Sequence, residues 1–223
     1  MKHTNTRTRI KAVIFDFDDT LINTKEISIA KHKEAAKELG IQFDERELIK
    51  RWGEPWPQLL YNLTRDRTDE FVKLILEFED FGFEKHKGVD IALSYLKSEE
   101  ILIGVLSSSR KEWIIKKAQN AGIDLSYFDA SLICGQEDVE NHKPHQASFT
   151  PIIKHLSTKG IKQEGVVYCG DNIVDFETAK NAKINFVAVT TGFHTMDDFV
   201  RAGLAPNLVI DSLDQLPEKI KEI

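Results

Sequence analysis

Short apolar runs recur along the chain, and from Leu93 onward they alternate with stretches of helical periodicity. Runs of this length, bounded by turn residues, are typical of strands buried in a sheet. They predict six strands, at residues 12–17, 102–107, 130–134, 166–170, 186–190 and 208–210. Gly122 is placed to end a helix at 110–121, and Thr195 with Asp198 resembles a capping box that begins another. Alternating strands and helices predict an α/β fold with a parallel sheet.

Residues 21–84 follow a different pattern, with three or four amphipathic helices and no convincing strand. Gly40 is placed to end the first helix and Asp44 to begin the second, and Gly-Glu-Pro-Trp-Pro at 53–57 interrupts the helical pattern. A helical insert between the first and second strands accounts for this segment. We therefore expect two structural units, an α/β core formed by residues 1–22 and 86–223 and a helical cap formed by residues 23–85.

Acidic residues follow the first predicted strand directly, at Asp16, Asp18 and Asp19. Two carboxylates about 4 Å apart repel each other by about 4 kcal/mol if the effective dielectric constant is about 20. Such crowding usually persists where a cation, or a reaction that uses negative oxygens, lies among the carboxylates. Ligands of open α/β sheets bind outside the carboxyl ends of the strands. This strand end is therefore a candidate site.

Polar groups also follow three later strands: Ser107 and Ser108 after the second, Lys143 beyond the third, and Asp171 and Asp175 after the fourth. Carboxyl ends of parallel strands share one edge of a sheet, so these groups are expected to meet the acidic residues of the first strand. Carboxylates, hydroxyls and a lysine at one edge match phosphoryl transfer.

The chemistry of phosphoryl transfer indicates a role for each group. Asp16 is the predicted nucleophile, and Asp18 would protonate the leaving oxygen and then activate water. Lys143, with the hydroxyl and amide groups of Ser107 and Ser108, is expected to hold the phosphate oxygens. A divalent cation would cancel the repulsion between the phosphate and the attacking carboxylate. Its candidate ligands are Asp16, Asp18, Asp171 and Asp175, the last of which could act through a water molecule.

Four segments resemble, in order, the signature motifs of the haloacid dehalogenase-like hydrolase superfamily. They are Asp-Phe-Asp-Asp-Thr-Leu at 16–21, Leu-Ser-Ser at 106–108, His-Lys-Pro-His-Gln-Ala-Ser-Phe at 142–149, and Gly-Asp-Asn-Ile-Val-Asp at 170–175 with Ala179 and Ala182. The resemblance implies a Rossmann-like parallel-sheet core, an inserted α-helical cap, a Mg²⁺ cofactor and, most often, phosphatase activity. Within the superfamily the chain looks like the phosphoglycolate phosphatase and β-phosphoglucomutase-like group. Ser108 and Lys183 depart from the pattern, since many members have Asn and Gly there.

Some of these residues have purely structural alternatives. Thr20 is a candidate for substrate binding, but it could instead cap the helix that follows it. Ser109 is expected to be only a polar loop residue. Arg51, Trp52 and Glu54 in the cap could select the leaving group, or they could simply pack a corner between helices.

Composition and charge limit the partners and the location. The formal net charge is −6, so no general basic surface is expected and nucleic acid is not an expected partner. No apolar run is long enough to span a bilayer, and residues 1–9 do not form a secretory signal, which favours a cytoplasmic protein. Cys134 and Cys169 are expected to be buried free thiols. No pattern indicates an oligomeric state.

The residues and the resemblance together predict a Mg²⁺-dependent phosphatase that hydrolyses a small phosphorylated metabolite through an aspartyl-phosphate on Asp16. A phosphosugar mutase would use the same core residues with a sugar hydroxyl as the acceptor. A catalytically silent phosphate-binding relative would share the fold without the activity. Phosphoglycolate, a hexose phosphate and a nucleoside monophosphate are all compatible with a cap of this size.

Overall fold

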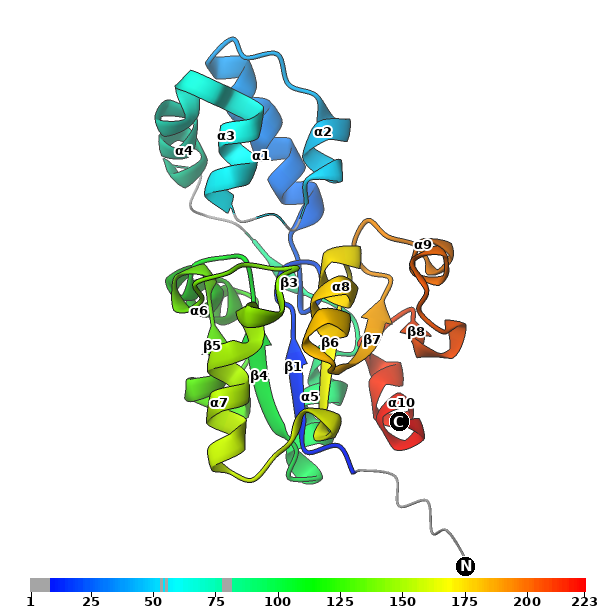
Figure 1. Ribbon diagram of the computed structural model, residues 1–223. Helices are drawn as coiled ribbons and strands as arrows, with labels where there is room; N and C mark the ends of the chain where they lie inside the picture. Colours follow the sequence, from blue (N-terminus) through cyan, green and yellow to red (C-terminus); the bar gives the residue numbers. More distant parts are fainter. Residues whose placement is uncertain (1–8, 53, 55, 78–81) are drawn as a thin grey trace, which may run out of the picture.

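A six-stranded parallel sheet forms the centre of the computed structural model, which describes residues 9–52, 54, 56–77 and 82–223 (Figure 1). The strand order is β5-β4-β1-β6-β7-β8, so β1 lies in the interior of the sheet between β4 and β6. The strands are β1 (Ala12–Phe15), β4 (Leu102–Leu106), β5 (Ile133–Cys134), β6 (Val166–Gly170), β7 (Asn185–Val189) and β8 (Val209–Ile210). The predicted α/β fold with a parallel sheet is confirmed.

Each of the six predicted strands is present, but most are shorter than their apolar runs. The largest difference lies at 130–134, where Ala130–Leu132 form a 3-10 helix and only Ile133–Cys134 pair with β4. The Asp129 side chain accepts a hydrogen bond from the Ser131 amide, and the Asp129 carbonyl accepts one from Leu132. This turn engages backbone groups that a longer strand would need for its ladder.

Helices cover both faces of the sheet (Figure 1). One face is covered by α5 (Val89–Ser98), α6 (Lys111–Asn120) and α10 (Leu216–Glu222), and the other by α7 (Thr150–Thr158), α8 (Ile173–Ala182) and α9 (Met196–Ala202). Alternate residues of β1 serve the two faces, since Val13 and Phe15 belong to one hydrophobic core and Ala12 and Ile14 to the other. A strand that is buried on both faces is continuously apolar, which explains why the sequence predicts β1 so clearly.

The helix ends agree with the turn residues in the sequence. Thr195 and Asp198 form the expected capping box of α9. Gly122 follows α6 with a φ of 68°, a left-handed conformation that glycine adopts without a steric penalty. Lys183 ends α8 in the same region with a φ of 55°. The departure at Lys183 thus concerns helix termination.

In the described part of the segment between β1 and β4, four α-helices form the cap: α1 (Lys25–Glu38), α2 (Glu45–Lys50), α3 (Trp56–Thr64) and α4 (Thr68–Glu77). They enclose a small hydrophobic core of their own, which includes Ala35, Leu60 and Phe71. Asp44 caps α2 by accepting a hydrogen bond from the Arg46 amide. Figure 1 shows the cap beyond the carboxyl ends of the central strands. The interruption expected at 53–57 includes Gly53 and Pro55, which lie outside the described residues.

The expectation that residues 21–84 contain no strand was wrong. Ile22–Asn23 (β2) and Glu84–Lys85 (β3) pair as a two-stranded antiparallel ribbon where the chain enters and leaves the cap. Two-residue strands are too short to show the alternation of apolar and polar residues by which strands are recognised in a sequence. We propose this ribbon as the boundary between the cap and the core.

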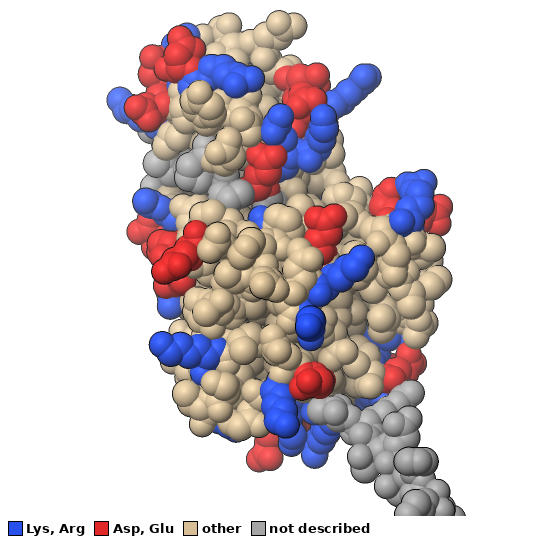
Figure 2. Space-filling model, in the orientation of Figure 1, with Lys and Arg blue, Asp and Glu red and all other residues tan. Residues whose placement is uncertain are grey.

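The surface carries charges of both signs. Figure 2 shows Lys and Arg side chains interspersed with Asp and Glu on the cap and on the core of the face displayed. Cys134 and Cys169 are buried free thiols, as expected. Within the described ranges, none of the helices has the length and apolar character that crossing a bilayer requires.

Candidate active site

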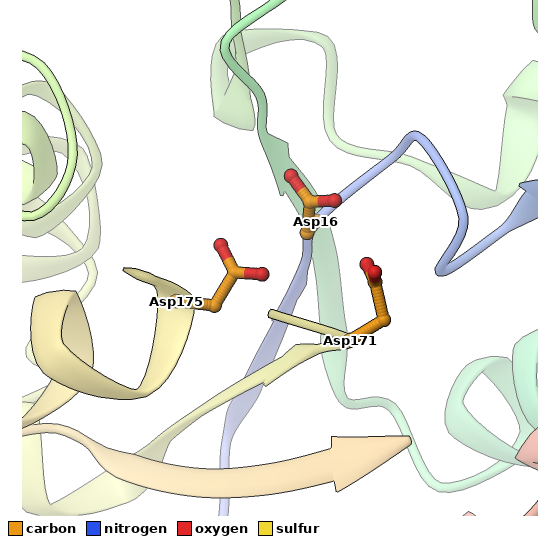
Figure 3. A group of neighbouring side chains, drawn as sticks. All are labelled: Asp16, Asp171 and Asp175. Atoms are coloured by element: carbon orange, nitrogen blue, oxygen red, sulfur yellow. The ribbon is translucent and has the colours of Figure 1, made fainter. Parts of the chain in front are cut away.

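Three buried carboxylates converge at the carboxyl ends of β1 and β6 (Figure 3). Asp16 directly follows β1, Asp171 follows β6, and Asp175 lies in the first turn of α8. The Asp16 amide donates a 2.8 Å hydrogen bond to the Cys169 carbonyl, so the sheet itself sets Asp16 beside the end of β6. One carboxylate oxygen from each residue lies within 4.8 Å of the other two. We call these three residues the carboxylate cluster.

The carboxylate cluster is electrostatically unfavourable without a counter-charge. Burial, reinforced by the nearby charge of Asp175, raises the pKa of Asp16 to about 7 even though Lys143 opposes the shift. Burial and the charge of Asp16 also raise the pKa of Asp171 well above its usual range. Several buried oxygen ligands that repel one another are the donor set of a hard divalent cation. The residues present therefore fit a metal ion.

The hydrogen bonds of the cluster distinguish its members. Asp16 Oδ1 accepts a 2.7 Å hydrogen bond from Lys143. Asp171 Oδ1 accepts one of 2.7 Å from the Thr20 hydroxyl. Both oxygens of Asp175 accept hydrogen bonds from protein groups, Oδ1 from Lys143 and Oδ2 from the Asn172 amide. Asp16 and Asp171 are thus better placed to bind a metal directly, and Asp175 to act through water.

Lys143 is the cation inside this arrangement. Its Nζ lies 2.7 Å from Asp16 Oδ1 and 2.7 Å from Asp175 Oδ1, and 5% of its side chain is exposed. Burial alone would lower the Lys143 pKa, but the charges of Asp16 and Asp175 outweigh it and raise the pKa above its usual value. Lys143 therefore stays charged. Tyr168 also belongs here, because its hydroxyl accepts from Lys143 and donates to Asp175 Oδ1 at 2.7 Å.

Asp18 lies outside the carboxylate cluster, although it was among the predicted metal ligands. Its Oδ1 is 2.6 Å from Lys117 Nζ, and its Oδ2 accepts a 2.6 Å hydrogen bond from the Ser109 hydroxyl. Ser109 lies in a loop, as expected, but its hydroxyl also contacts Asp18. Lys117 could not be recognised from the sequence, because a lysine on α6 has the pattern of an ordinary charged residue on a helix surface.

The predicted hydroxyl groups have distinct positions. The Ser107 hydroxyl accepts a hydrogen bond from the Ser109 amide and keeps its own proton to donate. The Ser107 amide donates to the Cys134 carbonyl within the sheet edge, so the amide role predicted for this pair of serines stays a prediction for Ser108. Ser108 lies beside a cavity, described next. Thr20 is fully buried, and its hydroxyl orients Asp171.

A cavity of about 170 Å³ separates the carboxylate cluster from the cap. Every predicted site residue except Thr20 lines it. On the core side Arg110, Trp113 and Lys117 add to the lining. The cap contributes residues of α1, α3 and α4 and of the segment after α2: Thr24, Ser28, Lys31, His32, Trp52, Glu54, Leu59 and Ile75. The cap therefore forms the wall opposite Asp16.

Asp19 and Trp52 join the cap to the core. Asp19 Oδ1 accepts hydrogen bonds from the first amides of the cap, those of Thr24 and Lys25, and its Oδ2 accepts one from the Trp52 indole N–H at 2.9 Å. The Trp52 carbonyl in turn accepts from the Asn172 side chain. Burial raises the pKa of Asp19 to about 6. The third acidic residue after β1 thus positions the cap.

The three cap residues singled out in the sequence have different surroundings. Trp52 and Glu54 line the cavity. Arg51 forms an ion pair with Glu54 at 3.1 Å and is not in the lining. A role in selecting the leaving group therefore stays a prediction for Trp52 and Glu54, with Arg51 holding Glu54 in place.

Comparisons with known proteins agree with this geometry. The sequence model of the haloacid dehalogenase-like hydrolases matches residues 13–189. A putative pyrophosphatase PpaX of Clostridium perfringens is 31% identical over 178 residues, which cover 78% of this chain and 80% of that protein. A phosphoglycolate phosphatase of Synechococcus elongatus is 25% identical over 96% of this chain and 99% of its own length.

A solved structure shows the same fold. The crystal structure of a putative haloacid dehalogenase-like hydrolase from Bacteroides fragilis superposes with a TM-score of 0.79 at 25% identity, covering 93% of this chain and all of that one. The similarity extends over the cap as well as the sheet, because so little of either chain is left out.

Proposed function

The chain belongs to the haloacid dehalogenase-like hydrolase family, and from that premise we propose that it is a Mg²⁺-dependent phosphatase acting on a small phosphomonoester through an aspartyl-phosphate on Asp16. One observation carries the proposal. Asp16, Asp171 and Lys143, which are distant in the sequence, lie together and buried at the edge of a cavity that the cap covers.

Asp16 is the nucleophile in this proposal. Lys143 donates to Asp16 Oδ1, whose second lone pair would serve the metal, so the other carboxylate oxygen attacks phosphorus and the bond to the leaving oxygen breaks. Lys143 and the Ser107 hydroxyl hold the phosphate oxygens, where negative charge develops. Bound Mg²⁺, held by Asp16 and Asp171 with Asp175 acting through water, would supply the positive charge that offsets repulsion between the phosphate and the carboxylate. Thr20 orients Asp171 in this scheme.

Asp18 transfers the protons. It gives a proton to the leaving oxygen, and it then takes one from the water that hydrolyses the aspartyl-phosphate. Lys117 and Ser109 each contact one oxygen of Asp18 and so hold its carboxyl group in position. The cap keeps bulk water away from the reactive phosphate, since the cavity lies beneath it.

Metal-dependent release of phosphate tests the proposal. The panel contains p-nitrophenyl phosphate, a hexose phosphate and a nucleoside monophosphate, together with pyrophosphate and phosphoglycolate because relatives are named for them. We expect release with Mg²⁺ and none with EDTA. Absence of metal-dependent release across the panel would indicate a silent relative. Conversion of one hexose phosphate into an isomer, dependent on a sugar bisphosphate primer and without phosphate release, would indicate a mutase.

We predict that Mg²⁺ raises the melting temperature more strongly as the pH increases from about 5.5 to about 8. Burial raises the pKa of Asp16 from 3.8 to about 7, so the folded, metal-free protein keeps a proton that the unfolded chain has lost. The contribution of Asp16 to the stability therefore falls as the pH rises from about 4 to about 7. Mg²⁺ binds the deprotonated carboxylates and relieves this loss. Thermal unfolding with and without Mg²⁺ at each pH measures the difference.

Melting temperatures with and without Mg²⁺ are subtracted because other groups change the stability with pH in the opposite direction. Burial lowers the pKa of His32 and of His86, so both contribute stability that increases as the unfolded chain loses protons near its ordinary histidine pKa. These contributions are common to both conditions and cancel. Asp171→Asn is expected to remove most of the Mg²⁺ effect. If the rise in melting temperature caused by Mg²⁺ does not depend on pH, or if it persists in Asp171→Asn, the proposed metal ligands are wrong.

A further inference from the structure

One face of α1, extended by its N-cap residue Thr24, contributes three polar side chains to the lining of the cavity. Thr24, Ser28 and His32 are spaced four residues apart, so they lie on the same side of the helix, and all three line the cavity opposite Asp16. They have no distinctive pattern in the sequence, because Thr, Ser and a lone His at helical spacing are common on any helix. Their position places them beside the leaving group rather than the phosphate.

His32 is the unusual member of this face. Only 4% of the residue is exposed, and its ring packs 5.7 Å from that of Phe71 in the cap core. Its Nε2 is buried and has no hydrogen-bond partner among the described residues, and neither has the Thr24 hydroxyl. Buried polar groups are nearly always satisfied, so an unpartnered one beside a cavity indicates a missing partner.

The other ring nitrogen determines what that partner must be. His32 Nδ1 lies 2.6 Å from the Ser28 carbonyl oxygen, which can only accept a hydrogen bond. Nδ1 therefore carries the proton. Burial lowers the pKa of His32, which keeps the ring neutral. Nε2 is consequently an acceptor with its lone pair unoccupied, and its partner must be a donor.

We propose that His32 Nε2 accepts a hydrogen bond from a hydroxyl group of the leaving group, so that the preferred substrate is a polyol or sugar phosphate. This inference rests on the proposed function. On the core side of the cavity, Gln136 Oε1 is likewise buried without a partner among the described residues, and it adds a second acceptor. A carboxylate or a second phosphate offers hydrogen-bond acceptors only, so its oxygens would be repelled by the lone pair of Nε2.

Lys31 and Arg110 also line the cavity and would attract a second anionic group. The substrates named for the two relatives, pyrophosphate and phosphoglycolate, have such a group. A leaving group with a hydroxyl and one with a second anionic group would therefore bind different residues of the wall opposite Asp16. Only the leaving group with a hydroxyl needs the acceptor on His32, so the two kinds of substrate should respond differently when His32 is replaced.

Matched substrate pairs test the proposal in the full-length protein with Mg²⁺. Each pair compares a hydroxylated ester with an analogue of similar shape without hydroxyls, namely glycerol 3-phosphate with n-propyl phosphate and glucose 6-phosphate with cyclohexylmethyl phosphate. The ratio of kcat/KM within a pair reports recognition of hydroxyl groups. We expect the wild type to favour the hydroxylated member of at least one pair by about tenfold or more, which is the usual effect of one satisfied hydrogen bond.

Three variants separate an acceptor from a structural role. His32→Leu should reduce the favoured ratio to near one, while its melting temperature is at or above that of the wild type because an unpartnered polar atom is removed. His32→Gln retains an acceptor and should keep most of the ratio. Glu34→Ala, on an exposed position of the same helix, should not change it.

Each outcome decides the matter. Ratios near one in the wild type, or a ratio that His32→Leu leaves unchanged, would overturn the proposal. Selective loss of pyrophosphate or phosphoglycolate turnover in His32→Leu would also overturn it, in favour of an anion. Wild-type protein that hydrolyses p-nitrophenyl phosphate but neither pair overturns this inference alone. Wild-type protein that does not hydrolyse p-nitrophenyl phosphate overturns the proposed function itself.

Discussion

Replacing Asp16 by Asn is expected to lower kcat by on the order of 10⁴-fold or more, because an amide oxygen does not attack phosphorus and no aspartyl-phosphate forms. The substitution conserves shape, and the amide oxygen can still accept the hydrogen bond from Lys143 that Oδ1 accepts now. The loss should therefore appear in turnover without loss of the fold. Release of p-nitrophenol from p-nitrophenyl phosphate and a thermal melt of the same preparation measure the two quantities.

A matched control comes from another strand of the same sheet. Asp211 follows β8 at its carboxyl end, as Asp16 follows β1, but it is exposed and does not line the cavity. Asp211→Asn should keep wild-type turnover. Retention of activity in Asp16→Asn would exclude covalent catalysis at this residue and leave the cluster as a metal site only.

The fold could be predicted well because its strands are buried on both faces. A strand such as β1, with every residue buried, has to be apolar throughout, and a polar residue directly after it is conspicuous. The topology then brings the ends of β1, β4, β5 and β6 to one edge without further information. This is why Asp16, Asp171 and Lys143 could be grouped from sequence alone, although they are far apart in the chain.

The side chains that hold these groups in place were harder to predict. Tyr168 sits in the middle of an apolar strand, and only its buried hydroxyl, which needs a partner, distinguishes it from another core aromatic. Lys117 reaches Asp18 from a helix whose charges otherwise face solvent. The acceptor role of His32 Nε2 follows only from the contact of Nδ1 with the Ser28 carbonyl. Such contacts depend on side-chain directions, which hydrophobic periodicity does not encode.

Short elements and hinges were missed for a related reason. The ribbon of β2 and β3 has only two residues per strand, so its pairing depends on where the rest of the fold brings the chain ends. Asp19 seemed in the sequence to be one more acidic residue of the site. It instead accepts hydrogen bonds from Thr24, Lys25 and Trp52 and so fixes the cap. Acidic residues that serve chemistry and those that serve structure are indistinguishable until their partners are known.

Replacing Lys143 by Met is expected to be the most damaging substitution for stability in the site. Its Nζ lies between Asp16 and Asp175, and removing it leaves two buried carboxylates without their cation. Breaking a buried ion pair from one side destabilises a protein by about 3–5 kcal/mol. Turnover should also fall by about 10²–10³-fold, since a donor to the phosphate oxygens is lost. Urea unfolding at pH 8 without metal, and kcat with Mg²⁺, measure the two effects.

The destabilisation by Lys143→Met should depend on pH, and substitution of a second lysine, Lys117, provides its control. Without Lys143 the carboxylates regain stability by taking up protons, so the destabilisation should shrink as the pH falls toward about 5. Mg²⁺ should raise the melting temperature of Lys143→Met more than that of the wild type, because it replaces the missing charge. Lys117→Met removes a partly exposed pair with Asp18, whose loss is expected to change stability by about 1 kcal/mol or less. Equal destabilisation by the two substitutions would mean that Lys143 does not neutralise the carboxylate cluster.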